Sequence, residues 1–315
     1  MFIEDTVSLT MIEIPHTTLC CIDCYNYELS IKAIKRCLQA CHFERTLFLT
    51  DMEYQLDNID VQKIPSIKTK EQYSRFLIKE LHAYIDTDFV LIIQFDGFIV
   101  NPDSWTVEFQ QYDYIGAKWD YTDGLNVGNG GFSLRSKRLL QALSNKDIVI
   151  DSLKYGEDTF ICRTYRRFLE KQYNIKFAPE SIADKFSHER FEPIEPIGKP
   201  FGFHGLFNIW RYIKPDELKD FINLISPRSI IANQAIEAIE LGLNYHMSGH
   251  LRQAEIIYQK ILEHYPDHTD VLALLKGLTH HKSGHLREAE MVYREMLEDY
   301  PDHIYLLALL DMVRS

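Results

Sequence analysis

The chain has 315 residues, of which 46% are hydrophobic, and its net charge is −12. This acidic charge argues against a protein that binds nucleic acid through a basic, phosphate-facing surface. The N-terminus shows no basic segment followed by a long apolar run, and no stretch of about 18 to 20 apolar residues occurs anywhere, so we expect no signal peptide and no transmembrane helix. We therefore predict a cytoplasmic protein, with at most peripheral contact with a membrane, whose six cysteines are reduced thiols.

The cysteines cluster near the N-terminus. Five of the six lie close together, namely Cys20, Cys21, Cys24, Cys37 and Cys41. Their spacing imitates that of zinc ligands. However, the first three fall in a β-like run and the last two in a helical pattern, and free cysteine is a common small core residue. We therefore favour buried core thiols over a zinc site.

The first two thirds of the chain alternate between strand-like and helix-like segments. Strands are predicted over 18–23, 45–51 and 89–95, with helices over 28–41 and 73–85. Strands that alternate with helices indicate βαβ units, and thus a mainly parallel sheet with both faces covered. We assign residues 1–227 to this α/β domain.

Asp96 follows directly on the apolar run FVLIIQF. In mainly parallel sheets, ligands bind beyond the carboxyl ends of the strands, so a carboxylate at this point suits a binding crevice. Gly97 comes next and allows a tight backbone. An aspartate that merely caps a turn explains the local sequence equally well.

Three further segments carry candidate functional residues. Residues 128–131 read GNGG, in which glycines bring bare backbone close to a neighbour, although a plain tight loop is the alternative. Glu157 and Asp158 stand at the start of an amphipathic helix, where acids are also favoured as caps. His204 lies in an aromatic, glycine-flanked loop, and a lone histidine of this kind is more often structural.

Taken in order, the segments QFDGF, DYIGAKW, VGNGGFSLRS, GED and FGFHG resemble the glycosyltransferases of the A-type fold. More closely, they resemble a largely uncharacterised family of glycosyltransferase-like domains, named mainly by its unknown function. The resemblance covers roughly residues 15–210. It implies a Rossmann-like domain that moves a sugar from a nucleotide-sugar donor, with a UDP-sugar favoured, to a hydroxyl of a glycan, a lipid-linked sugar or a protein.

The resemblance also implies a metal site. Gln94-Phe95-Asp96 falls where such enzymes carry an Asp-x-Asp motif, so Asp96 would bind the Mn²⁺ or Mg²⁺ that bridges the donor's diphosphate. His204 falls where many of these enzymes place a second metal ligand, and imidazole suits Mn²⁺ better than Mg²⁺. Gln94 departs from the family pattern, because it replaces the first acid of the motif.

Roles on both sides of the reaction follow from the same resemblance. Asp158, with Glu157 beside it, matches the general base of inverting members. The acceptor side would be lined by Trp119, Asn129, Gly130 and Gly131. The donor side would include Gln94, Phe95 and Gly97, and strand-end geometry adds Asp23, Tyr25, Lys70 and Arg75.

Two other classes of protein compete with the enzyme. One is an inactive A-type domain that serves as a scaffold; Gln94 favours it, whereas the presence of Asp96, Asp158 and His204 argues against it. The other is a nucleotidyltransferase, which usually has a glycine-rich loop with a basic residue near its N-terminus. Residues 16–30 contain no glycine, lysine or arginine.

The C-terminal segment repeats itself. Residues 248–268 return as residues 283–303 with an offset of 35, and this pattern resembles tetratricopeptide repeats. Gly242, Ala254, Tyr258 and Pro266 have counterparts at Gly277, Ala289, Tyr293 and Pro301. We assign residues 228–315 to about two and a half helical repeats that end in a partial helix over 302–314. These repeats would either support the main domain or bind a protein partner.

Overall fold

The computed structural model describes residues 11–119, 121, 123–151, 153, 155–189, 198–214, 217, 220–221, 224–225, 236–301 and 303–314. The chain divides into two compact units, residues 1–188 with 196–204 and residues 189–195 with 205–315. The predicted α/β class with a mainly parallel sheet, followed by a helical segment, is confirmed. The predicted domain boundary at residue 227 lies outside the described residues.

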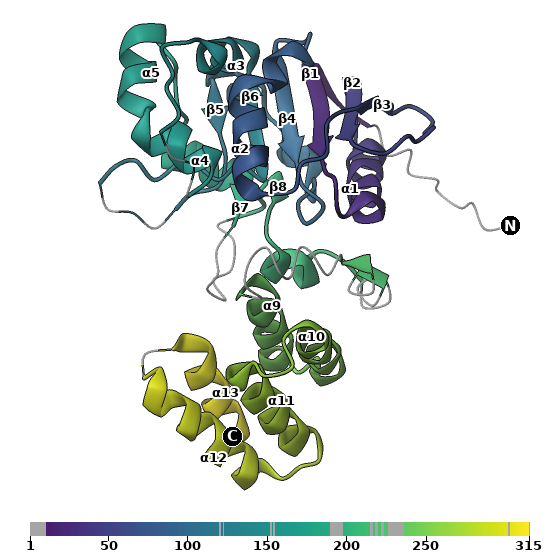
Figure 1. Ribbon diagram of the computed structural model, residues 1–315, viewed down its shortest axis with the longest axis vertical. Coiled ribbons are helices and arrows are strands. Elements are labelled where there is room, and N and C mark those ends of the chain that lie inside the picture. Colours follow the sequence, from purple (N-terminus) through teal and green to yellow (C-terminus); the bar gives the residue numbers. More distant parts are fainter. Residues whose placement is uncertain are drawn as a thin grey trace, which may run out of the picture. The chain divides into compact units, whose positions relative to one another are not determined.

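The first unit contains all the named strands of the described chain (Figure 1). These strands are β1 (Ile12–Ile22), β2 (Cys41–Thr50), β3 (Asp60–Lys63), β4 (Phe89–Ile93), β5 (Tyr114–Ile115), β6 (Phe132–Ser136), β7 (Ser187–His188) and β8 (Gly202–Phe203). Its α-helices are α1 (Tyr27–Ala40), α2 (Lys70–Lys79), α3 (Lys137–Ser144), α4 (Glu157–Thr159), α5 (Arg166–Tyr173) and α6 (Glu180–Phe186). Short helical turns are η1 (Leu81–Ala83), η2 (Pro102–Ser104), η3 (Val107–Gln111) and the π-helical η4 (Phe160–Thr164).

The main sheet has six strands in the order β3-β2-β1-β4-β6-β5. Strands β3, β2, β1 and β4 run parallel, whereas β6 is antiparallel to both β4 and β5. Cys21 pairs with Ile93, and Ile93 pairs with Phe132. The carboxyl ends of β1 and β4 therefore meet the amino end of β6 at one edge of the sheet.

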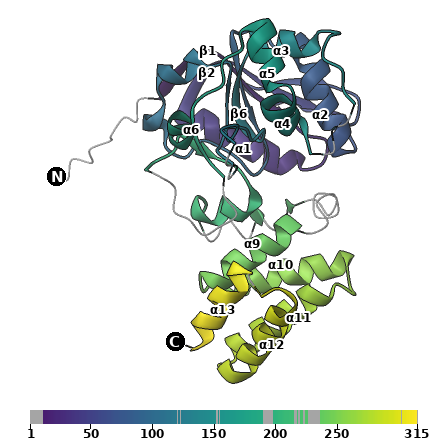
Figure 2. The ribbon, with the colours of Figure 1, turned by 90° about the vertical axis from the view of Figure 1, so that its left-hand side faces the viewer.

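The core forms because side chains alternate between the two faces of each strand. On one face, strand residues pack against α2 and α3 (Figure 2) in a cluster that includes Cys20, Ile22, Leu47, Leu49, Phe76, Leu77, Val90, Ile92 and Leu140. Leu19 and Cys21 alternate with these residues, so they point to the opposite face. All six cysteines are buried free thiols.

Three predicted elements differ in detail from the structure. The helix predicted over 73–85 begins at Lys70, where Thr69 caps it by accepting from the Gln72 N–H, and it continues beyond Lys79 only as η1. Cys41 was predicted in a helix but is the first residue of β2. The helix that starts at Glu157 changes to a π-helical turn, because Tyr165 N–H donates to the carbonyl of Phe160, five residues earlier.

The second unit is helical throughout its described elements. These are η5 (Leu206–Arg211), α9 (Ile236–Met247), α10 (Leu251–His264), α11 (Thr269–Lys282), α12 (Leu286–Asp299) and α13 (Ile304–Arg314). Helix α9 packs on α10 and α11 packs on α12. None of the described helices combines the length and apolar character that a membrane span requires.

The two helix pairs are packed in the same way. A Cβ added to Gly242 would lie 2.3 Å from Cε1 of Tyr258, and one added to Gly277 would lie 2.3 Å from Cε1 of Tyr293. The glycines thus let each tyrosine ring lie against the neighbouring helix, as the repeat pattern predicted. The resemblance to tetratricopeptide repeats and a partner-binding role stay predictions.

Candidate functional site

Asp96 occupies the turn that follows β4, and only 3% of it is exposed. The turn is closed by a 3.1 Å hydrogen bond from Gly97 N–H to the carbonyl of Gln94. Among the described residues, Oδ1 of Asp96 has no hydrogen-bond partner, and Nε2 of His204 lies 3.4 Å from it. A buried carboxylate normally has partners for its oxygens, so this atom is available to a ligand.

His204 is brought to Asp96 by the small parallel sheet of β7 and β8. Its N–H donates to the carbonyl of His188, and Phe203 N–H donates to the carbonyl of Phe98, two residues after Asp96. The imidazole lies between two glycines. A Cβ on Gly131 would lie 2.0 Å from Nε2 of His204, and a Cβ on Gly97 would lie 3.3 Å from its Cδ2. Only glycine at 131 leaves room for this ring.

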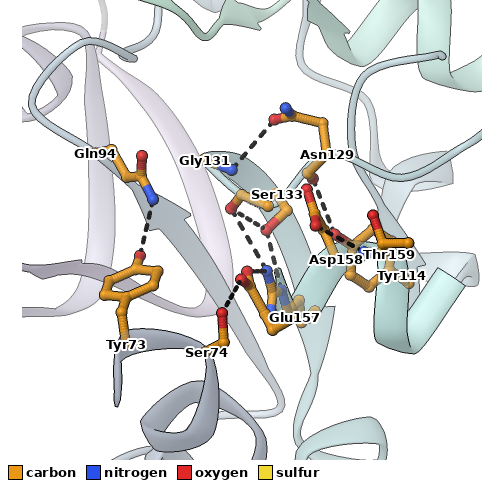
Figure 3. Close-up of polar contacts among 12 residues, drawn as sticks. Tyr73, Ser74, Gln94, Tyr114, Asn129, Gly131, Ser133, Glu157, Asp158 and Thr159 are labelled. Carbon is orange, nitrogen blue, oxygen red and sulfur yellow. Dashed lines mark hydrogen bonds and ion pairs between the residues drawn. The ribbon is translucent and has the colours of Figure 1, made fainter. Parts of the chain in front are cut away.

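Gln94, two residues before Asp96, joins His204 to α2. Its Nε2 donates to the hydroxyl of Tyr73 at 3.1 Å (Figure 3). Its Oε1 lies 3.1 Å from Nε2 of His204. With the amide oriented in this way, Oε1 is an acceptor and Nε2 of His204 carries the proton. The glutamine therefore orients the imidazole next to Asp96.

Glu157 is held in a buried ion pair with Arg135 of β6 (Figure 3). Nη2 of Arg135 donates to Oε1 of Glu157 at 2.9 Å, and their side chains are 0% and 6% exposed. Oε2 of Glu157 accepts from the Ser74 hydroxyl at 3.5 Å. Burial opposes the charge of Arg135, but Tyr114, Glu157 and Tyr73 raise its pKa above the usual value. Both carboxylate oxygens of Glu157 are thus engaged in the interior.

The same arginine fixes the GNGG loop to the sheet. Nε of Arg135 donates to the Ser133 hydroxyl at 3.0 Å, and that hydroxyl donates to the carbonyl of Gly130 at 2.9 Å. A Cβ on Gly130 would lie 2.3 Å from Oε1 of Glu157. The loop and the start of α4 therefore meet without a side chain between them.

Asp158 is half-buried, next to the ion pair but not part of it. Its Oδ1 accepts from the N–H of Thr159 at 2.6 Å. Gly156, at φ +96°, lets the chain turn into α4. A Cβ at that position would lie 3.0 Å from Oδ1 of Asp158 and 3.2 Å from Cε of Lys70. Lys70, predicted on the donor side, therefore lies close to Asp158.

The predicted acceptor residues lie together around the GNGG loop. The ring of Trp119 packs on Gly128, where a Cβ would lie 1.9 Å from its Cη2. Asn129 adopts φ +49° and its Oδ1 accepts from Gly131 N–H, while its carbonyl accepts from the Tyr114 hydroxyl at 2.9 Å. Asn129 is buried, whereas Trp119 is partly exposed.

The predicted donor residues do not all gather at this edge. Asp23 follows β1 and accepts from the N–H groups of Tyr25 and Asn26 and from the Ser30 hydroxyl. Burial raises the pKa of Asp23, its hydrogen bonds to Asn26, Ser30 and Tyr25 lower that pKa, and the charge of Asp96 raises it slightly. Arg75, in contrast, is exposed and pairs with Glu71 at 3.7 Å on the surface of α2.

The side chains of Asp96 and His204 together suit a divalent cation that is also bound by the phosphate groups of a substrate. No three His, Cys, Asp or Glu side chains of the described residues lie close enough together to hold a metal ion. Asp96 and His204 would supply two ligands, one carboxylate oxygen and one imidazole nitrogen. Mg²⁺ is commonly bound by one or two carboxylates together with substrate phosphates, and imidazole suits Mn²⁺. The residues therefore fit such a cation.

Sequence reasoning missed the residues that support the site, Arg135, Tyr73 and Ser74. Arg135 does leave a signal, because a charged residue stands inside the otherwise uncharged strand FSLRS. A charge in a buried strand requires a partner. Nothing in the sequence identifies that partner as Glu157, 22 positions further on.

Fold and site together define an α/β domain with a polar site at the carboxyl ends of its central strands. The model of a family described as a protein of unknown function, DUF5672, matches residues 53–204. No curated protein matches the chain.

Two similar solved structures are of the glycosyltransferase GlyE from Streptococcus pneumoniae TIGR4. The apo form is 13% identical with a TM-score of 0.40, and the match covers 71% of this chain and 63% of that chain. The second structure is 14% identical with a TM-score of 0.35, covering 69% and 62%. The chain thus spans less than two thirds of the length of GlyE.

Proposed function

We propose that the chain is a metal-dependent glycosyltransferase that moves a sugar from a nucleotide-sugar donor, with UDP-sugar favoured, to a hydroxyl acceptor with inversion. The observation that carries this proposal is the buried Asp96 carboxylate, whose Oδ1 has no hydrogen-bond partner among the described residues and lies 3.4 Å from Nε2 of His204. It stands where β1, β4 and β6 meet, which is the position for ligands in such sheets. The acceptor would be a glycan, a lipid-linked sugar or a protein.

Asp96 and His204 would hold Mn²⁺ or Mg²⁺. A cation bound there supplies charge neutralisation for the diphosphate leaving group. Gln94 would orient the His204 ring through the contact between Oε1 and Nε2. Metal binding through Nε2 would require the tautomer with the proton on Nδ1, and the Nε2 contact with Gln94 would then be lost.

The two adjacent acids of α4 would divide two tasks. Asp158 is half-buried, so its carboxylate would remove the proton from the acceptor hydroxyl as that oxygen attacks the anomeric carbon. Glu157 is engaged with Arg135 and Ser74, so it would hold the start of α4 against the GNGG loop. Glu157 is thus a positioning residue in this proposal, although it was predicted to be catalytic together with Asp158.

One observation favours a second candidate function, an inactive scaffold. Gln94 Oε1 lies 3.1 Å from Nε2 of His204, the atom that a metal would need. If this contact persists in the presence of metal ions, His204 cannot bind the metal, and Asp96 would be the single protein ligand of the two proposed.

Calorimetric titration with UDP and GDP, each with and without Mn²⁺, tests the proposal. We expect Mn²⁺-dependent binding of UDP, which Asp96→Ala and His204→Ala should each abolish. Asp103→Ala is the matched control, since Asp103 is an exposed aspartate of the same unit. UDP binding that does not depend on Mn²⁺ and that both variants retain would contradict the metal site. Nucleotide binding without transfer to any acceptor would favour the scaffold.

A further inference from the structure

A cavity lies in the first unit, and none of the residues that line it is among the predicted site residues. Its volume is about 480 Å³, within the roughly 300–1,000 Å³ of pockets that hold small organic ligands. Its walls come from the loop before the GNGG segment, from the start of α5 and from the start of α6. The residues that matter here are Asn126, Val127, Arg166, Phe177, Glu180 and Ser181.

Two lining side chains present polar atoms that lack a partner. Oδ1 of Asn126 and Nη1 of Arg166 are buried, and neither has a hydrogen-bond partner among the described residues. The other ends of both groups are anchored, since Nδ2 of Asn126 donates to Oε1 of Glu180 and Nε of Arg166 donates to Oε1 of Glu170. Buried polar atoms are nearly always hydrogen-bonded. Both residues line the cavity, and a ligand there that both donates and accepts hydrogen bonds would supply the partners that these two atoms lack.

The rest of the lining is apolar or balanced in charge. Val127 and Phe177 are buried, and the guanidinium of Arg166 lies over the Phe177 ring at 4.6 Å from its centroid. The positive charge of Arg166 is offset by Glu170 at 3.0 Å, and Glu180 adds a negative charge at the rim. A neutral sugar suits such a wall, because its hydroxyls both donate and accept while its C–H faces pack on apolar groups.

Two chain segments connect this cavity with the candidate active site. Val127 directly precedes the GNGG loop, and Asn126 accepts through its carbonyl from Trp119 N–H at 2.6 Å. On the other side, the helical run that begins with Glu157 and Asp158 leads through η4 to Arg166. The cavity is thus linked through these two segments to the residues predicted for the acceptor side and to the helix that carries Asp158.

From these contacts we propose that the cavity binds a neutral sugar unit of the acceptor, with Arg166 and Asn126 as its hydrogen-bonding residues. This inference rests on the proposed function, because it assigns the sugar to the acceptor. It identifies the acceptor as a carbohydrate or a carbohydrate-bearing molecule.

Titration of the full chain with a panel of neutral mono- and disaccharides, without nucleotide, tests the pocket by calorimetry. Arg166→Gln should weaken the binding of the best saccharide at least about tenfold, because it removes a charged hydrogen-bond donor. Arg167→Gln, an exposed arginine one position along the same helix, should leave it unchanged. Loss in both variants, or in neither, would overturn the assignment.

A second variant does not remove any buried contact. Ser181 is exposed at the rim, so Ser181→Trp adds bulk at the entrance, and it should block saccharide binding while Ser181→Ala retains it. If no saccharide binds while UDP binds through Asp96, the pocket is overturned and the proposed function stands. If a saccharide binds through Arg166 and no nucleotide binds, the sugar site is supported and the transferase fails.

Discussion

The α/β unit and the helical unit both bury polar side chains, but in different surroundings. At the sheet edge, Asp96 and Arg135 are ionisable, and each has one buried atom without a hydrogen-bond partner among the described residues. In the helical unit, Tyr258 and Tyr293 are buried in matching positions against glycines of the partner helices. Buried charges persist when they are paired or bind a ligand, whereas buried tyrosines mainly contribute packing. Because Tyr258 Oη likewise has no hydrogen-bond partner among the described residues, these groups differ in charge rather than in hydrogen bonding.

The largest expected effect comes from Asp158→Asn. If this carboxylate is the general base, transfer should fall roughly 10²- to 10⁴-fold, while Mn²⁺-dependent UDP binding stays unchanged, because Asp96 and His204 are intact. Single-turnover transfer and calorimetry measure the two quantities. Asp151→Asn, at an exposed position before α4, is the control. Unchanged transfer in Asp158→Asn would remove this residue from the mechanism.

The buried ion pair provides the next test. Arg135→Met should destabilise the α/β unit by about 3–5 kcal/mol, because it leaves the Glu157 charge unpaired in the interior. Urea unfolding measures this cost. A double variant, Arg135→Met with Glu157→Leu, should recover much of it, but its transfer activity should stay low, because α4 is no longer held to the loop.

The matched comparison is Arg294→Met in the helical unit. Arg294 pairs with Glu290 at 2.8 Å, but its side chain is 59% exposed. Its removal should cost at most about 1 kcal/mol, as for surface ion pairs in general. Equal losses in the free energy of unfolding for Arg135→Met and Arg294→Met would show that burial does not raise the cost of breaking the Arg135–Glu157 pair.

Two glycine substitutions distinguish the two units. Gly131→Ala places a Cβ 2.0 Å from Nε2 of His204, so it should displace the imidazole and abolish Mn²⁺-dependent UDP binding. Gly277→Ala places a Cβ 2.3 Å from the Tyr293 ring, so it should destabilise the helical unit by about 1–3 kcal/mol and leave UDP binding unchanged. Calorimetry measures the UDP binding, and urea unfolding measures the stability. Loss of UDP binding in Gly277→Ala but not in Gly131→Ala would contradict the roles given to both glycines.

The smallest effect concerns pH. His246 is fully buried, its Nε2 lies 3.0 Å from the Tyr293 hydroxyl, and burial, assisted by His281, lowers its pKa to about 3. A histidine whose pKa falls on folding stabilises the fold above its unfolded pKa of about 6.5, and this contribution is lost as the pH falls. Between pH 7 and pH 5.5 the helical unit should lose roughly 1 kcal/mol through this group.

Comparison with variants isolates that contribution. Urea unfolding of His246→Phe should show a pH dependence smaller by that amount over the same interval. His250→Gln, at an exposed position, should behave like the unchanged protein. Identical pH dependence in all three proteins would show that His246 does not titrate on unfolding.

Local patterns predicted much of the fold. The apolar run before Asp96 is β4, the alternation of strands and helices corresponds to the parallel part of the sheet, and the repeats correspond to matching helix pairs. The predicted secondary structure was wrong where backbone hydrogen bonds differ from those that the local pattern of apolar residues indicates. Cys41 fits a helical period but pairs with Ile12 at the start of β2. The segment after Glu157 fits one helix but contains a π-helical turn.

The positions of the candidate acids, glycines and apolar strands could be predicted from the sequence, because each depends on residues close together in the chain. The fold in three dimensions places Asp96 3.4 Å from His204 and pairs Glu157 with Arg135, and neither contact was predictable from the sequence. It also separated two adjacent acids, since Glu157 is buried and Asp158 is half-buried. The physical reason is that these contacts join residues 22 or more positions apart, and their formation depends on strand order and on burial, which no local pattern specifies.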